Sequence, residues 1–154
     1  MATDKKQKIS RDIPLAEITL RKYEKPSKMP KRELIRKVCL SVGLLQPGDS
    51  RDIIVDVFNV LLESKLPLDS EEIREDVIKL RKKERLPLHG IAASNIRRQI
   101  RRLRELFLVE KIKNKYRITE QESLSTIFQE KIKKFYIESI IIRVEDYFKS
   151  IKNR

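Results

Sequence analysis

Apolar residues recur at intervals of three and four in several stretches of the chain, with polar residues on the opposite side. This spacing is typical of helices that lie against a core. It predicts helices over residues 31–45, 51–64, 70–83 and 91–106. Pro30 suits a first helical turn, and Asp69 with Glu72 forms an Asp-x-x-Glu variant of the capping box. On the second helix the polar residues are expected to form a solvent-exposed stripe; they are Asp52, Asp56, Asn59 and Glu63.

Other stretches favour strands. Residues 18–23 have strand propensity and predict a short edge strand that Pro26 closes off. Residues 107–112 and 116–119 predict a hairpin around a tight turn, in which Asn114 is able to take a positive φ. Period-two alternation is expected to place most of the hairpin's cations on one face, subject to how the turn preserves the phase. These cations are Lys111, Lys113, Lys115 and Arg117.

The predicted helix over residues 91–106 has two contrasting sides. A narrow apolar stripe, which must face a core, consists of Ile96, Ile100, Leu103 and Leu106. The opposite side carries Ser94, Arg97, Arg98, Arg101 and Glu105, with Arg102 and Arg104 on its flanks. Arginine binds guanine edges and phosphates, so this side indicates contact with a polyanion. Because Glu105 would repel phosphates, Arg97, Arg98 and Arg101 are the best candidates.

Residues 123–152 are helical in pattern again and carry more apolar and aromatic surface than one helix can hide. Four of them are spaced four, three and four apart, as in the seam of two paired helices. The pattern predicts a homodimer through Ile137, Ile140, Ile141, Val144, Tyr147, Phe148 and Ile151. The alternative is a helix that folds back on its own domain.

The net charge of +13 is concentrated in two parts of the chain. Residues 1–40 and 97–117 carry +7 each, whereas residues 41–96 carry −2 and residues 118–154 carry +1. A phosphate-binding surface concentrates one sign of charge in this way. Residues 1–12 are polar and rich in lysine, and they predict a mobile basic tail.

The sequence offers little for catalysis or metal binding. His89 is the only histidine and Cys39 the only cysteine, which leaves no metal-ligand cluster and no Cys–His pair within one chain. We expect His89 in a turn and Cys39 in the core. Three glycines could hardly build a phosphate-binding loop. We therefore expect no enzyme activity, no metal and no cofactor, and neither a signal peptide nor a membrane span.

Part of the arginine-bearing helix and the hairpin resembles the recognition helix and first wing strand of winged helix-turn-helix regulators of the MarR, ArsR and Lrp kind. The matching runs are Ile-Ala-Ala-Ser-Asn-Ile-Arg-Arg-Gln-Ile-Arg-Arg-Leu from Ile91 and Leu-Val-Glu-Lys from Leu108. The resemblance covers residues 50–119. It implies a three-helix core with a β-hairpin wing, the third helix in the DNA major groove and the wing on the backbone. Such families usually have glycine where this chain has Phe107.

These features predict a mainly α protein with a small β-hairpin. It would comprise a basic tail and short strand (1–30), a winged-helix domain (31–121) and a C-terminal helical dimerisation segment (122–154). The expected function is sequence-specific binding of double-stranded DNA as a dimeric transcriptional regulator in the cytoplasm. The expected DNA contacts are Ser94, Asn95, Arg97, Arg98, Arg101, Arg102, Lys111, Lys113, Asn114, Lys115 and Arg117. Two alternatives stay open: an assembly subunit of a transcription, replication or chromosome-organising complex, and an RNA-binding factor.

Overall fold

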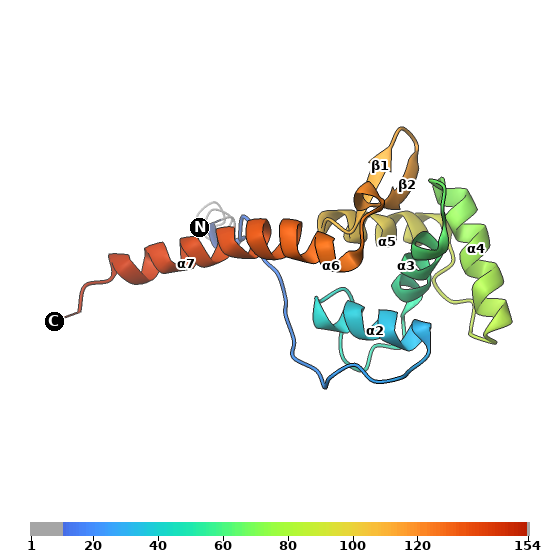
Figure 1. Cartoon of the computed structure of the whole chain (residues 1–154), viewed down its shortest axis with the longest axis horizontal. Helices are drawn as coiled ribbons and strands as arrows, with labels where there is room; N and C mark the ends of the chain where they lie inside the picture. Colours follow the sequence, from blue (N-terminus) through green and yellow to red (C-terminus); the bar gives the residue numbers. More distant parts are fainter. Residues whose placement is uncertain (1–10, 154) are drawn as a thin grey trace, which may run out of the picture.

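The computed structural model describes residues 11–153, which form a helical domain, a hairpin and a long C-terminal helix (Figure 1). The domain helices are α2 (Lys31–Ser41), α3 (Ile53–Glu63), α4 (Ser70–Lys83) and α5 (Ala93–Glu105). Strands β1 (Val109–Ile112) and β2 (Lys115–Ile118) follow, then a short 3-10 turn, Thr119–Gln121. The C-terminal helix consists of α6 (Leu124–Ile127), the π-helical segment η2 (Phe128–Ile137) and α7 (Glu138–Ser150). The predicted fold class is confirmed. The predicted basic tail lies, up to residue 10, outside the described residues.

Helix α3 is the centre of the core and packs against α2, α4 and α5. Its Val55, Val57 and Phe58 are completely buried. The apolar stripe predicted for α5 is confirmed, because its four residues are at most 8% exposed. Between α3 and α4, Leu68 forms an antiparallel bridge with Tyr116 of β2. Along the chain α3 is thus followed by the bridging residue, by α4 and α5, and then by the hairpin.

The ends of the helices follow from local sequence. Asp69 and Glu72 form the predicted capping box at the start of α4: the Glu72 N–H donates to Asp69 Oδ1 at 2.8 Å, and the Asp69 N–H donates to Glu72 Oε1 at 3.1 Å. Helix α2 ends earlier than predicted because Gly43 takes a φ of 80°, a conformation that glycine adopts without steric cost.

The prediction of a solvent-exposed stripe on α3 is wrong for three of its four residues: Asp56 and Asn59 are buried, Asp52 is half-buried, and Glu63 alone is exposed. Asp56 is completely buried and accepts hydrogen bonds from Arg32 of α2 and Arg81 of α4. Asp52 accepts from the same two guanidinium groups at 3.1 and 3.3 Å and from Arg36 at 3.2 Å. We call these five residues, of which Asp56 and Arg81 are buried, the ion cluster. Helical spacing does not reveal it, because the arginines come from other helices.

The ion cluster favours the charged form of Asp52. Burial by itself would raise the pKa of Asp52, but the hydrogen bonds and charges of Arg32 and Arg81 lower it below its ordinary value. Burial by itself would lower the pKa of Arg32, but the hydrogen bonds and charges of Asp56 and Asp52 raise it above its ordinary value. Helices α2, α3 and α4 are therefore joined by charge-assisted hydrogen bonds as well as by apolar packing.

The segment before α2 also differs from the prediction, because residues 18–23 form no strand. The Arg21 N–H donates to the Ser41 carbonyl at 2.9 Å. The Arg21 side chain donates to the carbonyls of Leu40 and Leu45 at 2.7 and 3.1 Å. These carbonyls lie at and beyond the end of α2, where backbone acceptors lack helical partners. The extended segment therefore closes the end of α2 rather than adding to the sheet.

Phe107, between α5 and β1, has a φ of 67°. The Leu108 N–H donates to the Leu103 carbonyl and the Phe107 N–H to the Arg104 carbonyl, which is the Schellman arrangement at a helix end. A side chain costs about 1–2 kcal/mol in this left-handed region. The Phe107 ring lies edge-on to the rings of Phe135 and Tyr136, with centroids 6.3 and 5.3 Å apart. Phe107 thus contacts the C-terminal helix.

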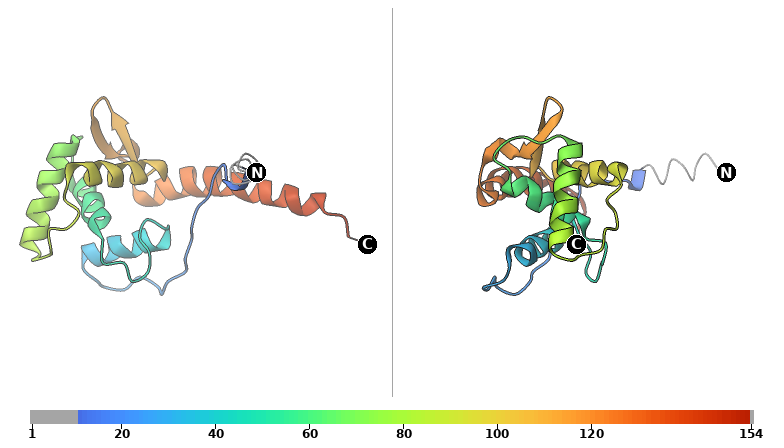
Figure 2. Two further views of the ribbon diagram at one scale, coloured as in Figure 1. Left: turned by 180° about the vertical axis from the view of Figure 1, so that it is seen from behind. Right: turned by 90° about the vertical axis from the view of Figure 1, so that its right-hand side faces the viewer.

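The C-terminal helix begins in the core and then leaves the domain. Ile127 and Ile132 are each 1% exposed, whereas α7 has no buried residue. Figures 1 and 2 show α7 projecting away from the other helices. Throughout residues 11–153, no helix combines the length and apolar character needed to cross a membrane.

Replacement of Asp56 by Asn is expected to lower the free energy of unfolding by about 3–5 kcal/mol, because Arg32 and Arg81 would lose their buried counter-charge. Urea unfolding followed by circular dichroism measures this loss. The matched control is Glu63→Gln on the same helix, whose ion pair with Lys31 is exposed and should contribute less than about 1 kcal/mol. Equal losses in the two variants would contradict the assignment.

Phe107→Gly is expected to be more stable than Phe107→Ala by about 1–2 kcal/mol, because both variants lose the ring but only alanine keeps a Cβ at positive φ. Thermal and urea unfolding of the two variants measure the difference. An alanine variant as stable as the glycine variant would show that the backbone at this position is not strained.

Candidate nucleic-acid interface

Two arginines of α4 fix the turn that leads into α5. Arg81 Nε donates to the Pro87 carbonyl at 2.7 Å, and Arg74 Nε donates to the Ile91 carbonyl at 2.6 Å. Arg81 is only 4% exposed. The sequence does hold a signal for this role: Arg74 and Arg81 are seven residues apart, so they lie on one face of α4. His89 lies in this turn, as predicted.

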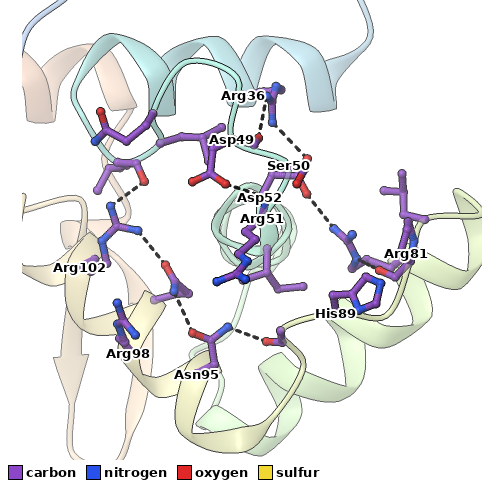
Figure 3. Close-up of a pocket in the computed structure, with 18 residues that line it drawn as sticks. Arg36, Asp49, Ser50, Arg51, Asp52, Arg81, His89, Asn95, Arg98 and Arg102 are labelled. Atoms are coloured by element: carbon purple, nitrogen blue, oxygen red, sulfur yellow. Dashed lines mark hydrogen bonds and ion pairs between the residues drawn. The ribbon is translucent and has the colours of Figure 1, made fainter.

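One flank of α5 carries a chain of side-chain hydrogen bonds (Figure 3). Asn95 Nδ2 donates to the Gly90 carbonyl at 2.7 Å, and Asn95 Oδ1 accepts from Gln99 Nε2 at 3.0 Å. Arg102 then donates to Gln99 Oε1 at 2.9 Å and to the Leu44 carbonyl at 2.7 Å. Asn95 and Arg102, both predicted to contact DNA, therefore hold α5 against the preceding turn and the α2–α3 loop.

The outer face of α5 is free of such contacts. Ser94, Arg97, Arg98 and Arg101 are exposed. Within residues 11–153 none of these three arginines forms an ion pair. Glu105 is also exposed, at the last residue of the helix. Because the opposite side of α5 is buried, uncompensated positive charge is held on a helix with a fixed orientation.

The cations of the hairpin do not gather on one face as expected. Ile112 pairs with Lys115 and Lys111 pairs with Tyr116, and residues directly opposite each other share a face. Lys115 and Arg117 therefore lie on the face of Ile112, and Lys111 lies on the other face. The cause is the two-residue turn, because it places each even-numbered residue of β1 opposite an odd-numbered residue of β2. The odd-numbered cations of the two strands therefore lie on opposite faces of the hairpin.

The tip of the hairpin is its most accessible basic part. Lys113 and Lys115 are exposed, as is Asn114 between them. Lys113 takes the positive φ, 56°, that was expected of Asn114. Arg117 instead donates to Glu110 Oε2 at 2.7 Å. Burial would raise the pKa of Glu110, but this bond and the one from the Glu120 N–H lower it.

The predicted dimerisation residues divide into two groups. Ile137 packs against the domain's own core and Ile140 is half-buried. The other five are between 49% and 78% exposed; they are Ile141, Val144, Tyr147, Phe148 and Ile151. The exposed part of the predicted dimerisation surface therefore lies on α7 and on Ile151, the residue after it.

The groups that could support other chemistry are few. Cys39 is buried, as predicted, and burial raises the pKa of its thiol to about 12, so it is a poor nucleophile. No three His, Cys, Asp or Glu side chains of the described residues are grouped so that they could hold a metal ion. No family model, curated protein or solved structure matches the chain. The geometry of α5, the hairpin and α7 is therefore the basis for a functional proposal.

Proposed function

We propose that the protein binds double-stranded DNA as a dimeric transcriptional regulator. The observation that carries the proposal is the outer face of α5, where exposed Arg97, Arg98 and Arg101 make no ion pair within the described residues. An α-helix fits the major groove, and guanidinium groups bind guanine edges or phosphates there. With Ser94 they form the exposed outer face of α5, on which Arg101 lies one turn before Glu105 at the end of the helix.

The hairpin tip supplies a second contact. Lys113 and Lys115 are exposed on an element that directly follows α5 in the chain. Cations at this place suit the phosphate backbone beside the groove, where they add affinity without reading sequence. This division of contacts supports duplex DNA as the target.

The exposed apolar face of α7 supports self-association. Val144 and Phe148 are one helical turn apart and 49% and 78% exposed, and contiguous apolar surface of this kind marks an interaction site. Two copies joined through α7 would hold two α5 helices at a fixed separation, which favours a two-fold symmetric DNA site. Such a regulator would work on the nucleoid in the cytoplasm.

Arg97→Ala is expected to weaken binding to the preferred duplex by about tenfold or more, and to relax one base preference in each half-site. Selection of bound sequences from random duplex DNA, followed by fluorescence anisotropy, measures both effects. The control is Lys28→Ala, which removes an exposed cation from the segment before α2 and should change the affinity by less than about twofold. Failure to enrich any sequence, or tighter binding of structured RNA than of duplex DNA, would overturn the proposal.

A Val144→Glu/Phe148→Glu double variant is expected to be a folded monomer, because it places charge in the proposed α7 seam without removing buried groups. Sedimentation velocity measures the state of association, and circular dichroism checks the fold. Lys149→Glu, also an exposed change on α7, should leave the dimer intact. A wild-type chain that sediments as a monomer would instead favour a different protein as the partner of α7.

A further inference from the structure

A cavity of about 1140 Å³ opens beside the flank of α5 that carries the hydrogen-bond chain (Figure 3). Its walls come from the α2–α3 loop, the α4–α5 turn and α5 itself. Leu44, Leu45 and Pro87 are among its apolar lining residues. Five arginines from four separate parts of the chain also line it: Arg36, Arg51, Arg81, Arg98 and Arg102.

The positive charge of this cavity is only partly compensated. Asp52 pairs with Arg36 and Arg81. The other lining carboxylate, Asp49, accepts the Arg51 backbone N–H at 2.9 Å. Across the described residues no ion pair involves Arg51, Arg98 or Arg102. These three arginines therefore leave an excess of positive charge around the opening.

The donors of these arginines are available to a ligand. In Figure 3 the Arg51 side chain extends into the middle of the opening, with Arg98 and Arg102 on one wall. Arg102 is held in place by Gln99 and Leu44 and keeps N–H groups beyond the two bonds that they accept. Guanidinium groups bind phosphate oxygens in pairs, and three of them without an ion-pair partner suit a ligand that carries several negative charges, such as one with more than one phosphate group.

We propose that the cavity binds a small organic phosphate with at least two phosphate groups, and that this ligand displaces DNA. Small-molecule sites are typically about 300–1,000 Å³, so the cavity has room for such a ligand and its water. Its inner wall includes Arg81, which is 4% exposed, and a rigid duplex cannot follow the surface to that depth. The apolar residues of the lining suit the organic part of the ligand.

The regulatory part of this inference rests on the proposed DNA binding, because Arg98 belongs to both surfaces. It lines the cavity and stands among the exposed arginines of α5. A phosphate bound by Arg98 would cancel its charge and place negative charge beside the DNA backbone. Ligand and DNA would therefore weaken one another's binding, and each would lower the affinity for the other by the same factor.

Isothermal titration of the full chain with ADP and with pyrophosphate, at constant ionic strength and without metal, tests the site. Both probes are expected to bind the wild type, and Arg51→Gln is expected to weaken them at least tenfold. The matched control is Arg11→Gln, which removes the same charge from an exposed arginine outside the cavity and should change affinity by less than twofold. Absence of binding, or equal weakening in both variants, would overturn the site.

Displacement of labelled duplex, followed by fluorescence anisotropy, tests the competition. ADP is expected to release DNA from the wild type, and Arg51→Gln is expected to need at least tenfold more ADP. Normal duplex binding without any binding of ADP or pyrophosphate would refute this inference and leave the proposed function standing. If Arg51→Gln without ADP weakens duplex binding as much as Arg97→Ala, the cavity holds a DNA phosphate and the inference is wrong.

Discussion

The arrangement of the domain depends on the buried carboxylate of Asp56, which lies between Arg32 of α2 and Arg81 of α4. A buried charge left without its partner is costly, so each of the three helices is constrained by the other two. Arg81 extends this constraint to the Pro87 carbonyl in the turn before α5. The ion cluster thus helps to place the turn from which the arginine-bearing helix begins.

The two sides of α5 that are not in the core have separate uses. Asn95 and Arg102 bind groups of the protein itself, whereas Arg97 and Arg101 make no ion pair within residues 11–153. Arg98 lies where the outer face meets the cavity. A single basic helix can therefore be held rigidly and still present charge to a polyanion, because different arginines perform the two tasks.

Features set by neighbouring residues in the chain could be predicted from the sequence, and features set by distant partners could not. The capping box at Asp69 and the apolar stripe of α5 depend on spacings of three and four, and both are present. The burial of Asp56 depends on arginines 24 and 25 residues away, which periodicity does not contain. Which face of the hairpin each cation occupies depends on the length of the turn between β1 and β2. The cavity could not be foreseen either, since its arginines meet only in the folded chain.

Phe107 connects the end of α5 to the C-terminal helix, and this contact has a consequence for any dimer. The residue lies two positions before β1, and its ring packs edge-on against Phe135 and Tyr136 within η2. Tyr136 also hydrogen-bonds the backbone of Glu17, so the C-terminal helix is held from two directions. If two copies pair through α7, the separation of their α5 helices is set by these aromatic contacts rather than by a flexible linker. The strained backbone at Phe107 is then part of what fixes the separation of the two α5 helices.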